Sequence, residues 1–316
     1  MSSAHSGHTE IGEHDPGNAY QSLADTVGHD DPRWAFGTGV EDVQAEITSP
    51  VPDGVDPADL AAYCLMLGDD ALICSQRLSE WVSNAPELEE DVALANTALD
   101  LLGQARILLA RAGHVEAAAT AGSTERDEDA LAYLRAESEF RNVALAELPD
   151  NLDFARAIAR LLLFSTWRLA LLQRLLDSRD PVLAAVAGKG VKELAYHRDY
   201  AARWTLRLGD GTDDSRTRMQ AALTAVWPYR EELFRTSEVE RRLAAAGVAV
   251  DPGSTRDEVD AVLDEVLGRA TLTRPTIPAV GTIGGRGGRH GLHTEYLGHV
   301  LAEMQSLARQ HPGATW

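Results

Sequence analysis

The apolar residues after about residue 56 recur at alternating steps of three and four, and this spacing restricts the chain to helices. The first stripe of this kind consists of Leu60, Cys64, Leu67, Ala71, Cys74, Leu78 and Trp81. Residues at these steps share one face of an α-helix, because a helical turn contains 3.6 residues. Alternating Val, Ile and Thr runs bounded by turns, which would signal strands, are nearly absent. The sequence therefore predicts an all-α fold.

The same periodicity predicts several long helices joined by short loops. They cover about residues 57–85, 86–112, 127–148, 152–176, 181–208, 213–234 and 292–309. We expect a kink at Pro228, a capping box over Thr255–Glu258 and an irregular loop over 273–289. Residues 152–176 are apolar on most sides, as in a central buried helix. No linker divides residues 56–316, so we expect one helical-bundle domain with extra C-terminal helices.

Residues 1–55 differ in composition from the rest of the chain. They are rich in Gly, His, Asp, Pro and Ser and contain one short apolar cluster, Trp34–Phe36. Such a segment buries too little apolar surface to offset the entropy of ordering, so we expect a mobile arm. The spacing of its histidines is irregular, which favours a polar tail over a metal-binding one; they are His5, His8, His14 and His29.

The charge and the cysteines of the chain argue against a nucleic-acid-binding protein and against a disulfide-bonded one. The chain carries 29 Lys and Arg against 49 Asp and Glu, a net charge of −20 that disfavours nucleic-acid binding. Cys64 and Cys74 lie in one predicted helix, about 15 Å apart, which is too far for a disulfide and favours a reducing compartment. We find no run of 18 apolar residues and no apolar segment typical of a secretory signal, and therefore expect a cytoplasmic protein without a membrane partner.

A long-helix bundle raises the question of a di-iron carboxylate site, which needs two Glu-x-x-His motifs and two further Glu residues. None of the ten histidines has an acidic residue three positions before it. Glu193 and His197 are four apart, and we interpret them as a hydrogen-bonded pair rather than as metal ligands. Asn96, Asp100 and Gln104 form a polar line at steps of four, typical of a buried network, a solvated face or the relic of a site.

Other candidate sites are weaker. The densest cluster of possible ligands lies near the C-terminus, and its spacing matches no zinc motif, so we interpret it as cap, loop or interface residues; it contains His290, His293, Glu295, His299 and Glu303. Arg286 and Arg289 lie among glycines without a phosphate-binding loop motif, which weakly suggests contact with a partner or an anion. There is no Gly-x-Ser-x-Gly motif, and both cysteines fall on the core stripe, where thiols are commonly inert.

Several segments, in order, resemble the C subunits of bacterial phenylacetyl-CoA 1,2-epoxidases, also called phenylacetate-CoA oxygenases. The similarity covers about residues 60–316 and is carried by residues 67–70, 75–81, 85–91, 98–106, 192–197, 208–212, 291–295, 301–305 and 312–316. The resemblance implies a ferritin-like helical bundle within a multicomponent monooxygenase. That complex uses O2, and NADPH through a separate reductase, to epoxidise the ring of phenylacetyl-CoA.

The resemblance also implies that a sister subunit of related fold carries the di-iron centre and the CoA-ester pocket. Laid on this chain, the sister's ligand positions fall on Leu101, Gln104, Leu194 and a residue near Ser165, and only His197 is retained. We therefore expect no catalytic, cofactor-binding or metal-binding residues in this chain.

The resulting interpretation is a non-catalytic structural subunit that supports the di-iron subunit in aerobic phenylacetate catabolism. Its expected partners are the di-iron subunit and the other subunits of the complex, including the reductase. Two alternatives stay open. The chain could be an autonomous metal-dependent oxygenase with an atypical site around Asp100, Glu193 and His197, or a free-standing helical binding protein.

Overall fold

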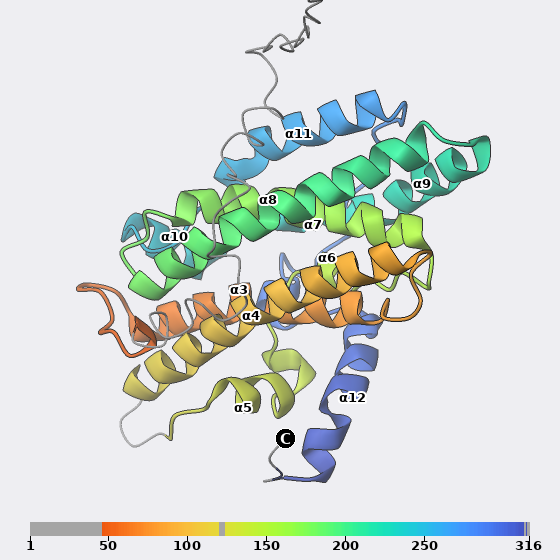
Figure 1. Ribbon diagram of the computed structural model, residues 1–316. Helices are drawn as coiled ribbons and strands as arrows, with labels where there is room; N and C mark the ends of the chain where they lie inside the picture. The colour runs from red at the N-terminus through yellow and green to blue at the C-terminus, as the bar shows by residue number, and fades with distance from the viewer. Residues whose placement is uncertain (1–45, 120–123, 313, 315–316) are drawn as a thin grey trace, which may run out of the picture. The chain divides into compact units, whose positions relative to one another are not determined.

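The computed structural model describes residues 46–119, 124–312 and 314, all of which belong to one compact unit, 39–316. Regular structure in these residues is helical, apart from one isolated bridge between Ile283 and Arg286. The four longest helices are α3 (Pro57–Ser79), α4 (Leu88–Ala119), α7 (Phe154–Leu175) and α8 (Pro181–Gly209). Helix α3 packs along α4, α7 packs along α8, and α4 meets α8 (Figure 1). This arrangement confirms the predicted all-α, ferritin-like long-helix bundle.

Shorter helices surround these four. They are α5 (Glu128–Tyr133), α6 (Ala144–Glu147), α9 (Asp213–Val226), α10 (Glu238–Ala245), α11 (Arg256–Arg269) and α12 (Glu295–Gln310). Short 3-10 segments connect them: η2 (Glu137–Glu139), η3 (Trp227–Phe234), η4 (Pro252–Thr255) and η5 (Gly288–His290). Helices α9 and α11 pack on α7 and α8, whereas α12 contacts α3, α5 and α6 (Figure 1).

The starts of α3 and α8 follow directly from sequence. Each has proline at its first position and aspartate before it, and the aspartate carboxylate accepts a hydrogen bond from a backbone N–H of the first turn. The distances are 2.9 Å from Ala58 N to Asp56 and 3.0 Å from Leu183 N to Asp180. Helix α7 is buried on most sides, as predicted. The helix predicted over 213–234 with a kink at Pro228 is shorter than expected: α9 ends at Val226, and the 3-10 segment η3 begins at Trp227.

The helix predicted over 127–148 is wrong. The chain forms only α5, η2 and α6 there, with extended residues between them. Two buried carboxylates of α3 accept the backbone N–H groups that a continuous helix would use: Asp69 accepts from Arg141 N at 2.8 Å, and Asp70 accepts from Val143 N at 2.8 Å. Tertiary hydrogen bonds to α3 therefore override the local helical pattern.

Two helix ends and one cap also differ from the prediction. Helix α3 ends at Ser79, before 85, and α4 runs on to Ala119, because Gly113 does not end it. A Cβ at Gly113 would lie 1.8 Å from the carbonyl oxygen of Arg126, so glycine is needed there for a close backbone approach. The capping box at Thr255 is wrong, since its hydroxyl donates to the carbonyl of Pro252 at 2.8 Å.

The segment predicted to be a mobile arm is described only from residue 46. Two of its last ten residues contact the bundle directly, because the buried guanidinium of Arg111 donates to the carbonyls of Ile47 at 2.8 Å and Ser49 at 2.5 Å. Residues 1–45, with His5, His8, His14, His29 and the Trp34–Phe36 cluster, lie outside the described residues, so their mobility stays a prediction.

Helix α4 is long and apolar, and less than half of its most apolar window is buried. Among the described residues, it is the one helix long and apolar enough to cross a membrane by length and composition, and 44% of its most apolar window is buried. A core helix can pass the same test.

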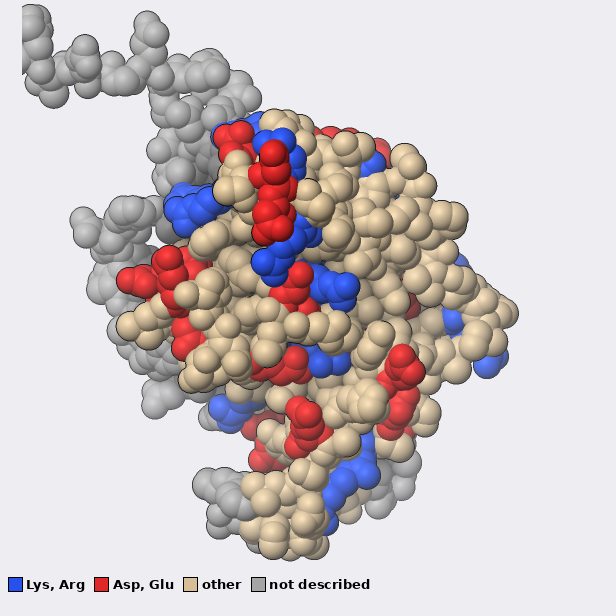
Figure 2. Space-filling model, turned by 90° about the vertical axis from the view of Figure 1, so that its right-hand side faces the viewer, with Lys and Arg blue, Asp and Glu red and all other residues tan. Residues whose placement is uncertain are grey.

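On the face shown in Figure 2, basic and acidic side chains lie interspersed rather than gathered by sign.

Candidate functional site

The ligand positions suggested by the resemblance lie in the interior of the bundle. Leu101, Ser165 and Leu194 are fully buried and Gln104 is nearly so. The Ser165 hydroxyl donates to the carbonyl of Leu161 in its own helix at 2.6 Å. Two of these positions therefore carry apolar volume, and the third is satisfied by its own backbone.

The interior also contains a buried guanidinium that no sequence motif indicated. Arg168 lies on α7 one turn after Ser165 and is completely buried. Its Nε donates to Gln104 Oε1 and its Nη2 to the carbonyl of Leu67, both at 3.1 Å. Burial lowers the pKa of Arg168, with the charge of Asp70 acting in the opposite direction. The one sequence feature that could have indicated this buried guanidinium is the position of an arginine within the apolar run of 161–172.

Gln104 links this guanidinium to α8. Its amide nitrogen donates to Glu193 Oε2 at 2.9 Å while its amide oxygen accepts from Arg168. Burial raises the pKa of Glu193, and Asp100 raises it further; the Gln104 hydrogen bond, Lys189 and His197 oppose this. The other Glu193 oxygen lies 3.4 Å from Lys189 Nζ. The network thus joins α3, α7, α4 and α8 through one cation and one amide.

His197 pairs with a residue other than the predicted one. Its ring is fully buried, and Nε2 lies 3.0 Å from Asp100 Oδ2 on α4, while Nδ1 has no hydrogen-bond partner in the described part of the chain. The predicted pairing with Glu193 is therefore replaced by a pairing with Asp100. The three residues of the polar line on α4 therefore have different environments. Asn96 is exposed, Asp100 is half-buried and Gln104 belongs to the buried network.

Other inward-facing carboxylates pair with arginines. Asp69 lies 3.0 Å from Arg135 Nη1, and Asp70 accepts two bonds from Arg289, at 2.9 and 2.8 Å. Two more buried pairs are Arg160–Asp150 at 2.5 Å and Arg111–Asp180 at 2.6 Å. Over the residues that the structure describes, no group of three or more His, Cys, Asp or Glu could hold a metal ion. This donor set does not fit a di-iron centre, which needs several free carboxylates.

The C-terminal cluster makes loop contacts, which is one of the roles expected from its sequence. His293 Nδ1 lies 2.6 Å from Glu147 Oε1 and Nε2 lies 3.1 Å from the carbonyl of Phe140. Thr294 donates to the other Glu147 oxygen from both its backbone N–H and its hydroxyl. The remaining members are exposed; they are His290, Glu295, His299 and Glu303.

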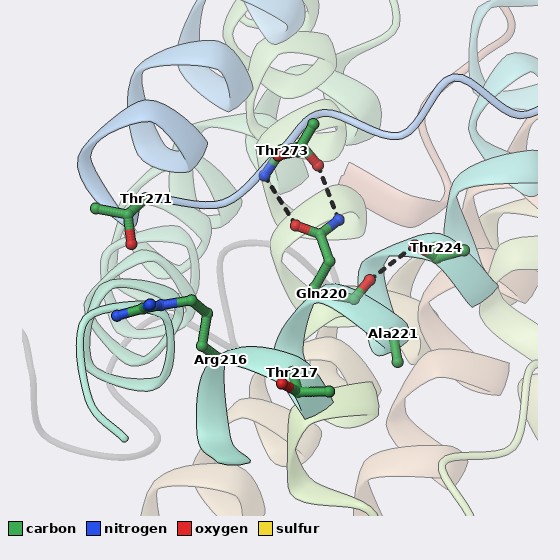
Figure 3. Close-up of a pocket in the computed structure, with 7 residues that line it drawn as sticks. All are labelled: Arg216, Thr217, Gln220, Ala221, Thr224, Thr271 and Thr273. Atoms are coloured by element: carbon green, nitrogen blue, oxygen red, sulfur yellow. Dashed lines mark hydrogen bonds between the residues drawn. The ribbon is translucent and has the colours of Figure 1, made fainter. Parts of the chain in front are cut away.

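The cysteines and a surface pocket along α9 offer no nucleophilic group. Cys64 and Cys74 are buried, and burial raises the pKa of both thiols, to about 11 for Cys74. The pocket, of about 450 Å³, lies along α9 and is lined mainly by threonines and Gln220 (Figure 3). Gln220 exchanges two hydrogen bonds with the backbone of Thr273, at 2.9 and 2.8 Å, and so braces the chain after α11.

Comparison with known proteins identifies the family of this chain. Residues 47–316 match the family model described as phenylacetic acid catabolic protein. The chain belongs to this family. It is also 48% identical over 257 residues to the C subunit of the 1,2-phenylacetyl-CoA epoxidase of Escherichia coli (strain K12), covering 81% of this chain and 99% of that protein. The resemblance inferred from the motifs is thereby confirmed.

Carboxylates placed at the leucine positions of this family member should destabilise it. We expect Leu101→Glu and Leu194→Glu each to lower the free energy of unfolding by about 3 kcal/mol, because an unpaired buried charge is costly. For Leu99→Glu, at a position 47% exposed on α4, we expect little change. Thermal melts of the isolated chain test this, and unchanged melting temperatures for both buried substitutions would contradict it.

The raised pKa of Glu193 gives a pH-dependent prediction. When folding raises the pKa of a carboxyl group, its ionisation lowers the free energy of unfolding, and the full loss is reached above the folded-state pKa. The loss disappears as the pH falls below the pKa of the unfolded chain, about 4.3. We expect Glu193→Gln to be more stable than the wild type at pH 7, with the gain shrinking towards about pH 4.5. The lost contact with Lys189 matters little, since that side chain is 63% exposed.

Urea unfolding at several pH values measures this gain, with the exposed Glu303→Gln as control. A Glu193→Gln variant less stable than the wild type at pH 7 would show that the ionised carboxylate stabilises the bundle.

Proposed function

We propose that this chain is a non-catalytic structural subunit of a phenylacetyl-CoA monooxygenase, a ring 1,2-epoxidase, in aerobic phenylacetate catabolism. It would support a di-iron catalytic subunit that receives electrons from NADPH through a reductase, and would itself hold no cofactor. The similarity to the C subunit of an epoxidase, over almost the whole length of that protein, supports this role.

The observation that carries the proposal is the buried guanidinium of Arg168 at the centre of the bundle. A divalent ion about 4 Å from a fixed positive charge would be repelled by roughly 8 kcal/mol at an effective dielectric constant of about 20. Carboxylates would have to offset this repulsion. Of the carboxylates nearby, Asp70 is paired with Arg289. Glu193 accepts a hydrogen bond from the neutral amide of Gln104, and Asp100 lies 3.0 Å from His197 Nε2.

The outer face of α4 is the surface we propose for pairing with the di-iron subunit. Leu88, Val92 and Leu99 are 74%, 52% and 47% exposed and lie at steps of four and seven, hence on one side of the helix. Tyr196 of α8, the helix that α4 meets, is 48% exposed. Contiguous exposed apolar residues on a long helix are typical of a subunit interface. Two related bundles joined through such faces would form a pseudo-symmetric heterodimer.

Purification of the chain alone and with the di-iron subunit tests the proposal. We expect the isolated chain to bind no stoichiometric iron and to show no turnover, and the two chains together to form a stable complex. Leu99→Glu should weaken the complex without unfolding the isolated chain, because it places a charge in the proposed interface.

Two outcomes would contradict the proposal and point to the alternatives. Stoichiometric iron with an oxo-bridged absorption band in the isolated chain would indicate an autonomous oxygenase. Failure to associate with any epoxidase subunit would indicate a free-standing binding protein.

A further inference from the structure

A short hairpin before α12 presents apolar side chains to the surface. Ile283 and Arg286 exchange backbone hydrogen bonds of 3.2 and 3.1 Å around Gly284 and Gly285. Both glycines have positive φ, +59° and +81°, as a two-residue type I′ turn requires. Ile283, directly before the turn, is 74% exposed, and Val280, at the start of the hairpin, is 43% exposed.

The hairpin is fixed to the body of the protein at its base. Val280 N donates to the carbonyl of Pro228 at 2.9 Å, and Gly288 N donates to Glu232 Oε1 at 2.8 Å. A Cβ at Gly288 would lie 2.0 Å from the carbonyl oxygen of Asn142, so the backbone is pressed against its neighbour. The exposed apolar residues are therefore held in place, which lowers the entropic cost of binding a partner.

A cleft of about 140 Å³ lies between this hairpin, η3 and the start of α12. At about 30 Å³ for each water molecule, it has room for a side chain the size of a carboxylate. Its lining includes Tyr229, Glu232, Arg235, Ile283, Arg286 and Leu292.

The cleft carries two guanidinium groups that no carboxylate binds directly. Arg235 and Arg286 form no side-chain hydrogen bond or ion pair within the described ranges, whereas most arginines there are paired. Glu231 feels the charge of Arg235, but its carboxylate is bound by Arg256, which contributes most to lowering the pKa of Glu231. Both guanidinium groups therefore keep their hydrogen-bond donors available.

The acidic groups nearest the cleft are already engaged. The carboxylate of Glu232 accepts from two backbone N–H groups, of Gly288 and Ala144, at 2.8 Å each. The carboxylate of Glu147 is bound by His293 at the cleft wall.

We propose that this cleft binds a carboxylate side chain from another polypeptide of the complex, with apolar residues beside it in that chain. The carboxylate would pair with Arg235 and Arg286, since arginine binds carboxylates through two parallel hydrogen bonds. Val280, Ile283 and Leu292 would cover the neighbouring apolar residues, as the rim of a binding hot spot does. This inference rests on the proposed role as a subunit and assigns it a second contact, apart from the α4 face.

Charge reversal tests the inference. The variants are Arg235→Glu, Arg286→Glu and the double variant, with Arg241→Glu as control, because that arginine is 59% exposed on α10. Affinity for the other epoxidase subunits is measured by titration calorimetry at low and high salt. We expect each single reversal to weaken binding at least about tenfold, the double variant to bind more weakly still, and the control to stay within about twofold of wild type. Salt should weaken the wild-type complex more than the double variant.

The outcomes separate the two proposals. If the wild type forms the complex and the reversed variants bind equally well, the cleft does not recognise a carboxylate and this inference is overturned alone. If the wild type forms no complex with any epoxidase subunit, the proposed function fails and this inference falls with it. Melting temperatures equal to that of the wild type show that the reversals leave the fold intact.

A photo-crosslinking residue at Ile283, in the full complex, gives a second readout. We expect it to link to a peptide of another subunit that contains Asp or Glu beside apolar residues. Links only to a second copy of this chain, to a peptide without an acidic residue, or to nothing would overturn the inference.

Discussion

Buried arginine–carboxylate pairs anchored on α3 hold this bundle in its particular form. Asp69 and Asp70 are fully buried; Asp69 binds Arg135, and Asp70 binds Arg289. Removing one partner of such a pair typically costs about 3–5 kcal/mol, because the other charge is then left unpaired in a medium of low dielectric constant. These two pairs, with the backbone bonds from residues 141 and 143, therefore fix the segment 135–143 and the loop before α12 against α3.

The same pairing of charges bears on function. A ferritin-like bundle that binds metal leaves several inward carboxylates free to balance the cations. In this chain the two fully buried carboxylates of α3, Asp69 and Asp70, are balanced by arginines, and the buried guanidinium of Arg168 lies between Gln104 and the carbonyl of Leu67. The fold has thus kept the geometry of its family while its interior charges are arranged for packing. We propose that contacts with partners lie at the surface, on the α4 face and at the hairpin cleft.

Local rules predicted most of the fold. The apolar stripe of residues 60–81, the Asp-Pro starts of α3 and α8 and the apolar run of α7 were readable because each depends on neighbouring residues. The segment 127–148 was not, since its backbone N–H groups bond to carboxylates about 72 residues away. The predicted helix end at Gly113 was wrong for a similar reason, because only the fold shows the backbone of Arg126 lying against this glycine.

The interior of the bundle was predictable only where a residue's own type decides its role. The apolar character of Leu101 and Leu194 could be read directly from their positions in the motifs. The pairing of His197 with Asp100 and the role of Arg168 could not, because both depend on how α4, α7 and α8 are placed in space.

The most direct test of an arginine-filled centre is a crystal structure with anomalous data collected at the iron edge, from protein purified in the presence of ferrous iron. We predict that the Arg168 guanidinium occupies the bundle centre, bonded to Gln104 and the carbonyl of Leu67, with no anomalous peak between α4, α7 and α8. An iron peak coordinated by Asp100, Glu193 and His197 would contradict this prediction.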